Sequence, residues 1–240
     1  MEITLYIILL VYFLIGGIVI SIVNKGKEPA TKKYNWVKYF VYLVIVNALF
    51  ASILFRPAIF HVICIIIFVL GLYEILNLTL TIKKAKDGSI ALLILGMLSF
   101  SFYHFSLMPK KYLFYTLFMT TVFDAFSQLA GQLFGKRKMA PKISPNKTYE
   151  GLAGGLFFSL FTSMLIYRLL PTNMGQAFLL GLGMSMSALA GDLLASYCKR
   201  RFGIKDFSRL IPGHGGVLDR FDSLITSGSF MFVMADIFKL

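Results

Sequence analysis

The sequence predicts an all-α, polytopic integral membrane protein, and three observations support that prediction. The chain has 240 residues, of which 58% are apolar and 15% charged, whereas a soluble domain has about 45–50% and about 25%. Eight apolar runs are long enough to cross a bilayer. The basic residues gather in alternate connections between those runs. This composition excludes a disordered chain and argues against a single soluble globule.

The eight apolar runs follow one another with no soluble domain between them. The first run has no basic segment before it and no small-residue cleavage site after it, so we interpret it as a retained span and not as a signal peptide. The third run is long enough to tilt or to end early at Glu74, and Asp236 interrupts the last one. We expect transmembrane helices at about residues 3–23, 36–55, 57–82, 89–108, 112–133, 151–170, 176–197 and 221–239.

The net charge of +13 comes from 24 Lys and Arg against 11 Asp and Glu. Nineteen of the basic residues lie in the first, third, fifth and seventh connections, and five lie in the even connections and at the C-terminal end. Since positively charged connections stay on the cytoplasmic side, we expect the odd connections to face the cytoplasm and both termini to face outward. The basic residues at 25–38 and 83–87 are expected to set topology or to contact anionic lipids. No nucleic-acid partner is needed to explain the excess.

Acidic residues inside apolar runs are costly, so they usually face a cavity or a partner. The candidates are Glu74, Asp124, Asp192 and Asp236. For Glu74 and Asp236 we expect a structural hydrogen bond in the bundle or a position at the interface, because no recognisable polar pattern accompanies either. The two cysteines, at positions 64 and 198, have neither metal-ligand spacing nor the pattern of a disulfide framework.

Asp192 is accompanied by further polar groups along its helix. Ser196 and then Lys199 or Arg200 follow at i+4 and i+7 or i+8, so these side chains are expected to share one face. An acid, a hydroxyl and two cations on one face, at the cytoplasmic end of the seventh span, could hold a metal ion and a phosphate.

Asp124 allows two interpretations. Together with Ser127 or Gln128 and Gly131 it could form a polar face. The small residues around it, Ala130 and Gly131 among them, could equally serve close helix packing.

The connection KDFSRLIPGHGGVLDRFD, residues 205–222, combines three kinds of group. Glycines let backbone N–H groups approach an anion, cations bind phosphate, and carboxylates are ligands that Mg²⁺ prefers. The combination predicts a metal-assisted phosphate site at the membrane surface, with His214 expected to be structural. The groups are Gly213, Gly215, Gly216, Lys205, Arg209, Arg220, Asp206, Asp219 and Asp222.

The connection GKRKMAPKISPNKTYEG, residues 135–151, is either a solvated basic loop or a phosphate clamp. Pro141 and Pro145 stiffen it. A compact polar cluster follows, formed by Ser144, Asn146, Lys147 and Thr148.

Residues 196–222, SYCKRRFGIKDFSRLIPGHGGVLDRFD, resemble the signature of the phosphatidate cytidylyltransferases, also called CDP-diacylglycerol synthases. That signature reads S-x-hydrophobic-K-R, four residues, K-D-x-small, two residues, hydrophobic, P or G, x-H-G-G-hydrophobic-x-D-R-hydrophobic-D. This chain matches nearly every fixed position of it, with Cys198 in place of an aliphatic residue. The loop at 135–151 is similar to the family loop ending S-P-x-K-T-W-E-G, with Tyr149 in place of Trp. Asp124 falls where the family has an intramembrane Asp, although DAFSQLAG departs from the usual D-(S/T)-x-A-Y form. The match covers about residues 124–222.

The resemblance implies that CTP and phosphatidate react to give CDP-diacylglycerol and pyrophosphate in phospholipid biosynthesis. The lipid phosphate would attack the CTP α-phosphorus without a strong general base, helped by Mg²⁺ (or Mn²⁺), with K⁺ open as a second ion. The metal ligands would be Asp192 and Asp219. The catalytic set implied is Asp192, Asp219, Lys199, Arg200, Lys205, Asp206, Arg220 and Asp222. The substrate-binding set is Ser144, Lys147, Thr148, Ser196, His214, Gly215, Gly216 and Asp124.

Two parts of the chain are expected to have different roles, one forming the scaffold and lipid cavity and the other carrying the catalytic residues. Residues 1–110 would form N-terminal membrane helices that act as scaffold and lipid cavity, and residues 111–240 a catalytic membrane domain with the loops 134–150 and 198–222. The site would face the cytoplasm from the plasma (inner) membrane. Assembly as a homodimer is one possible oligomeric state.

Two rival functions remain at this point. One is a cytidylyltransferase or CTP-dependent kinase for another lipid or polyprenyl phosphate. The other is a transporter or scaffold, although a transporter would be expected to place paired polar residues near the midplane of several spans.

Overall fold

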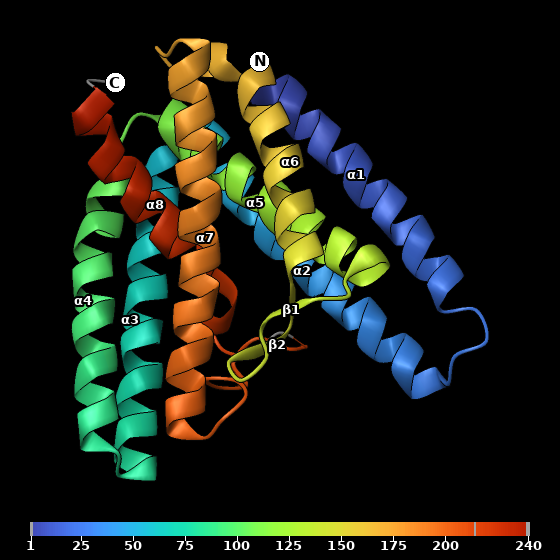
Figure 1. The fold of residues 1–240 in the computed structure, drawn as a ribbon, viewed down its shortest axis with the longest axis vertical. Coiled ribbons are helices and arrows are strands. Elements are labelled where there is room, and N and C mark those ends of the chain that lie inside the picture. Colours follow the sequence, from blue (N-terminus) through green and yellow to red (C-terminus); the bar gives the residue numbers. More distant parts are fainter. Residues whose placement is uncertain (1, 214, 239–240) are drawn as a thin grey trace.

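The computed structural model describes residues 2–213 and 215–238, and it confirms an all-α membrane protein (Figure 1). A helix lies in each of the eight predicted ranges. A short 3₁₀ helix, η1, spans Tyr167–Leu169. The α-helices are α1 Glu2–Val23, α2 Pro29–Phe55, α3 Pro57–Ile82, α4 Ala85–Ser106, α5 Lys110–Phe134, α6 Tyr149–Leu165, α7 Met174–Phe202 and α8 Leu218–Phe238.

Six of these helices are long and apolar enough to cross a membrane, namely α1, α2, α3, α4, α7 and α8. The other two differ from a simple lipid-facing span. α6 has 17 residues, and α5 is buried over most of its first half, from Tyr112 to Thr120. The protein is therefore polytopic, while the count of eight crossings stays a prediction.

Several helices extend beyond their apolar runs. α2 starts seven residues before its run because Pro29 occupies the first turn, where its missing N–H costs nothing. α7 starts at a capping box between Asn173 and Gln176 and ends at Gly203, which has the left-handed φ of 76° that glycine adopts easily. Lys199 and Arg200 thus lie in the last turn of α7, and the loop expected at 198–222 is shorter.

The loop expected at 134–150 contains a small antiparallel hairpin. Strand β1, Lys138–Ala140, pairs with β2, Ser144–Thr148. Thr148 then begins α6 as its N-cap, since its Oγ1 accepts the Gly151 N–H at 3.1 Å. The hairpin is thereby fixed to the start of a helix.

α5 lies at the centre of the bundle, where it contacts α2, α6, α7 and α8. Two hydroxyl pairs join it to its neighbours: Tyr115 Oη to Ser163 Oγ at 2.6 Å, and Thr120 Oγ1 to Ser227 Oγ at 2.7 Å. Such pairs satisfy polar groups away from water. The core around α5 is rich in fully buried aromatic rings, among them Phe50, Phe60, Phe105, Phe114 and Tyr115.

The connections are sorted between the two ends of the bundle. Figure 1 shows the start of α1 and the end of α8 at the upper end, with the α4–α5 and α6–α7 connections. The α1–α2, α3–α4 and α7–α8 connections and the hairpin lie toward the lower end. The four strongly basic connections therefore share one side, as the charge pattern predicts.

Candidate active site

Two adjoining cavities lie among α2, α5, the hairpin, α7 and the start of α8. The smaller has a volume of about 710 Å³ and the larger about 1120 Å³. Five residues line both cavities, so they form a common wall. These are Lys38, Asp124, Gln128, Gln132 and Arg220.

The smaller cavity collects most of the residues expected from the sequence. Its carboxylates come from three helices, with Asp124 on α5, Asp192 on α7, and Asp219 and Asp222 on α8. The hairpin side contributes Ser144, Asn146, Lys147 and Thr148, and α7 contributes Lys199.

Asp192 is held by an ion pair that joins α7 to the hairpin. Its Oδ2 lies 2.6 Å from Lys147 Nζ, and its Oδ1 accepts a hydrogen bond from Ser196 Oγ at 3.3 Å. The Asp192 side chain keeps 36% of its surface exposed. One carboxylate thus remains accessible to a ligand in the cavity while its position is fixed.

Asp219 has a more enclosed environment, with 5% of its side chain exposed. Its Oδ1 accepts from Lys199 Nζ at 2.6 Å, and its Oδ2 accepts the backbone N–H groups of Phe207 at 2.7 Å and Gly216 at 2.9 Å. Asp219 therefore ties the start of α8 to α7 and to both ends of the segment 206–217.

The expected shared face on α7 is only partly present. Ser196 is buried beside Asp192, and Lys199 lines the cavity, but Arg200 lines neither cavity. The Arg200 guanidinium instead donates to the carbonyls of Ile143 and Ile204. Eight residues along an α-helix rotate a side chain by about 80°, so Arg200 points in a different direction from Asp192 and reaches the turn of the hairpin at Ile143.

The neighbourhood of Asp124 combines a cavity wall with close helix packing, and a functional role of its carboxylate stays a prediction. Its side chain lines the cavities. One to two turns further along α5, Ala130 and Gly131 pack against Gly154 and Gly151 of α6, where a Cβ atom would meet them. Small residues let the two helices approach closely, and this brings Thr148 and the hairpin to the cavity.

Glu150 anchors the other end of the hairpin. Its carboxylate accepts the backbone N–H groups of Lys136 and Arg137 at 3.1 Å each, and Arg137 Nε lies 3.4 Å away. Backbone N–H groups, its own and that of Lys136 first among them, lower the pKa of Glu150 to about 2. The carboxylate therefore stays ionised, and the anchor persists, throughout the neutral and mildly acidic range.

The glycine-containing segment lies at the larger cavity. Lys205, Asp206, Arg209, Gly213 and Gly215 line it, together with Arg220 from the common wall. Gly213 and Gly215 have φ of 75° and 84°, a left-handed conformation that glycine adopts without strain. Gly216 lines neither cavity and instead donates its N–H to Asp219. His214 lies outside the described residues.

α2 lies in the region expected to form a lipid cavity, and it contributes individual residues that no sequence motif singles out. Lys38 lines both cavities, and Tyr34, Tyr39 and Tyr42 line the larger one. The Arg220 guanidinium lies 4.2 Å from the centre of the Tyr42 ring, in cation–π geometry. No motif marks these residues, and only the packing of α2 against α5 brings them to the site.

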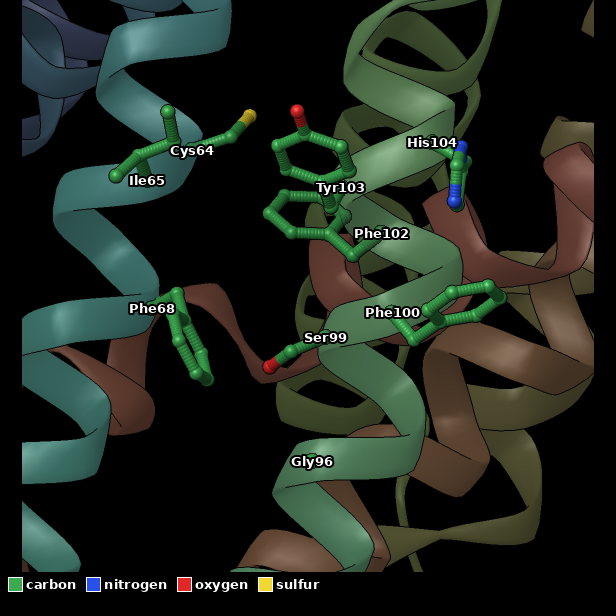
Figure 2. A pocket seen from close by; sticks show the side chains of 9 residues that line it. All are labelled: Cys64, Ile65, Phe68, Gly96, Ser99, Phe100, Phe102, Tyr103 and His104. Carbon is green, nitrogen blue, oxygen red and sulfur yellow. The ribbon is translucent and has the colours of Figure 1, made fainter.

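A third pocket, of about 360 Å³, lies between α3 and α4, away from the charged groups (Figure 2). Cys64 and Phe68 of α3 face Ser99, Phe102 and Tyr103 of α4 there. None of the expected site residues lines it, so this pocket is not part of the candidate site.

Fold and site together define a polytopic membrane protein with two adjoining, highly charged cavities at one side of the bundle. A family model described as the cytidylyltransferase family matches residues 110–238. The chain belongs to that family.

Two relatives named as phosphatidate cytidylyltransferases agree with this assignment, and a third is similar in sequence. The phosphatidate cytidylyltransferase of Rickettsia bellii is 32% identical over 230 residues, which cover 88% of this chain and 96% of that protein. The phosphatidate cytidylyltransferase of Staphylococcus aureus (strain COL) is 44% identical over 125 residues, or 51% of this chain and 46% of that protein. The Escherichia coli protein YnbB, described as uncharacterized, is 44% identical over 119 residues, covering 49% and 40%. The chain thus matches less than half the length of the last two relatives.

Proposed function

We propose that the protein transfers the cytidylyl group of CTP to phosphatidate, forming CDP-diacylglycerol and pyrophosphate for phospholipid synthesis. The observation that supports this most is the common wall between the two charged cavities. A reaction between two anionic substrates requires two binding sites whose reacting ends meet. The names of the relatives indicate which two substrates these are.

The charges of the two cavities suggest which substrate each one takes. The larger has five cations against two acids, and none of these five cations has an ion-pair partner within residues 2–213 and 215–238. The cations are Lys27, Lys38, Lys205, Arg209 and Arg220. Its lining also includes the apolar Ile20 and Leu129. A cation-rich cavity with an apolar side suits a lipid phosphate.

The smaller cavity suits the nucleotide. Its four carboxylates are a source of hard oxygen ligands, and its lysines provide charge for a triphosphate. Phosphatidate would approach the CTP α-phosphorus across the common wall, at Lys38 and Arg220. A phosphate oxygen of the lipid forms the new bond to that phosphorus, and the bond to the bridging oxygen breaks as pyrophosphate leaves.

The residues present fit a divalent metal ion. Within the described part of the chain, no three His, Cys, Asp or Glu side chains are grouped so that they could hold an ion by themselves. Mg²⁺ is commonly bound by one or two carboxylates and substrate phosphates. Asp192 and Asp219 would hold it, with Asp124 and Asp222 lining the same cavity. Bound there, Mg²⁺ or Mn²⁺ would neutralise the triphosphate charge. K⁺ is a candidate for a second ion at the site.

The chain's own residues would supply positioning and charge. Lys147 and Lys199 hold Asp192 and Asp219, and Arg220 lies at the meeting point of the cavities. The lipid phosphate is already an anion, so no strong base is required. We place the site on the cytoplasmic side of the inner membrane, following the charge pattern. The chain could act as a monomer or as a homodimer.

The proposal is tested by assaying the purified chain in micelles with CTP, Mg²⁺ and a panel of acceptors. We expect a CDP-lipid from phosphatidate and little product from polyprenyl phosphate. Addition of EDTA should abolish turnover and excess Mg²⁺ should restore it. A clear preference for a polyprenyl phosphate would contradict the proposed substrate, and full activity in EDTA would contradict the metal assignment.

A further inference from the structure

Glu74 is a buried carboxylate that reaches the site from a distant part of the chain. It lies in α3, outside the residues that match the family model, and its surface is 1% exposed. Its Oε1 accepts from Ser208 Oγ at 2.5 Å and from the Val217 N–H at 2.7 Å, and its Oε2 accepts from the Leu218 N–H at 3.0 Å. The carboxylate is thus matched by three donors.

Two of those donors belong to the N-terminus of α8. The first N–H groups of a helix have no partner inside the helix, and a nearby Ser, Thr, Asp or Asn usually satisfies them. Here the acceptor comes from a residue 143 positions earlier in the chain. A negative charge at this end also complements the helix dipole. Glu74 therefore acts as an N-cap supplied by another helix.

The capped turn is the one that carries the charged site residues. Asp219 and Arg220 directly follow Leu218. Gly216 lies against Glu74 so closely that a Cβ atom there would be 2.5 Å from Oε1. Glu74 and Asp219 thus both hold the segment 206–217, Glu74 through Ser208 and Val217 and Asp219 through Phe207 and Gly216.

We propose that Glu74 is a positioning residue for cytidylyl transfer, which holds Asp219 and Arg220 at the two cavities. This inference rests on the proposed function for its catalytic consequence. Glu74 lines neither cavity, so it would not contact substrate. Its effect should therefore appear mainly in kcat, because a displacement of about 1 Å at a reacting centre can cost roughly 100-fold in rate.

The substitution Glu74→Gln tests this with almost no change in volume. One carboxylate oxygen becomes an NH₂ group, which cannot accept a hydrogen bond. If the NH₂ replaces Oε2 it opposes the Leu218 N–H, and if it replaces Oε1 it opposes the Val217 N–H. Either way one backbone donor of the α8 terminus loses its acceptor. We expect kcat to fall roughly 10- to 100-fold, with KM for CTP and for phosphatidate within about threefold.

Asp236→Asn is the matched control, because it also neutralises an acid in an apolar helix. Asp236 lies near the far end of α8, and its side chain is exposed. We expect it to leave kcat unchanged. Ser208→Ala is the graded variant if Glu74→Gln does not fold, because it removes one donor and leaves the carboxylate with both backbone N–H groups. It should lower kcat by a few-fold.

Hydrogen exchange provides a readout that does not depend on turnover. The amides of Val217 and Leu218 should exchange slowly in the wild type and faster in Glu74→Gln, but not in Asp236→Asn. Unchanged exchange at these amides, or wild-type kcat in Glu74→Gln, would overturn the positioning role. A wild type that forms no CDP-lipid would instead refute the proposed function, and the exchange experiment would then decide whether Glu74 caps α8.

Discussion

Asp192 and Asp219 both face lysines, but they do different structural work. Asp192 is 36% exposed and makes one ion pair, while Asp219 is 5% exposed and accepts two backbone N–H groups as well. Removing an acceptor from a buried donor costs about 1–3 kcal/mol, more than removing an exposed one. Substitutions of these two carboxylates should therefore distinguish an effect on turnover alone from an effect on both turnover and stability.

We expect Asp192→Asn to lower cytidylyl transfer by at least about 100-fold, the scale found when a key electrostatic group is lost, with little change in melting temperature. Asp219→Asn should lower both turnover and melting temperature. Turnover assays and thermal unfolding in the same detergent make the comparison. Wild-type turnover in Asp192→Asn would remove this residue from the proposed metal site.

Arg209 lines only the larger cavity, so it distinguishes the two substrates. We expect Arg209→Gln to raise the KM for phosphatidate by roughly 3- to 30-fold, as for the loss of a charge-assisted hydrogen bond, without raising the KM for CTP. Lys33→Gln is the control, because Lys33 is exposed on α2, lines neither cavity and changes the charge equally. A rise in the KM for CTP alone would reverse the assignment of the cavities.

Among the residues, motif chemistry predicted most of the charged ones that line the cavities from α5, the hairpin, α7 and α8. It placed Arg200 with Asp192, which is wrong for the described geometry because i+8 turns away. It could not identify Lys38 or Tyr42, since no motif marks them. It left Glu74 as a structural hydrogen-bonding group, and the structure confirms hydrogen bonding while showing which helix end it caps.

Among the elements, hydropathy predicted where helices lie because each run is apolar over about 20 residues. It did not predict their polar extensions, since the start of α2 and the end of α7 depend on Pro29 and Gly203 and not on apolar residues. The hairpin 138–148 also escaped prediction, because its strands are short, basic and contain Pro145. The site depends on these polar ends.

The pair α5–α6 should be sensitive to side-chain size. A Cβ atom at Gly154 would contact Ala130 Cβ. Overpacking typically costs about 1–3 kcal/mol, so Gly154→Val should lower the melting temperature and reduce turnover by displacing Thr148 and the hairpin. Gly96→Ala is the control, since nothing lies within 4 Å of a Cβ there. Equal melting temperatures for both variants would contradict this packing role.

For the whole molecule, the charge of +13 has two parts. Nineteen cations lie in the odd connections, which Figure 1 places toward one end of the bundle. Some of them line the paired cavities, and others, such as Lys83 and Lys86, do not. The first group fits phosphate binding and the second fits topology. Composition alone could not separate these groups, because the separation depends on tertiary packing.

The central claim is that the common wall joins a nucleotide to a lipid phosphate by cytidylyl transfer. The most direct measurement incubates the purified chain with phosphatidate, Mg²⁺ and CTP in two parallel reactions. The CTP is labelled at the α-phosphorus in one reaction and at the γ-phosphorus in the other. The account predicts that the α label enters the lipid while the γ label leaves as pyrophosphate in equal amount. Transfer of the γ label to a lipid would show a CTP-dependent kinase instead, and no labelled lipid from either form would contradict the account.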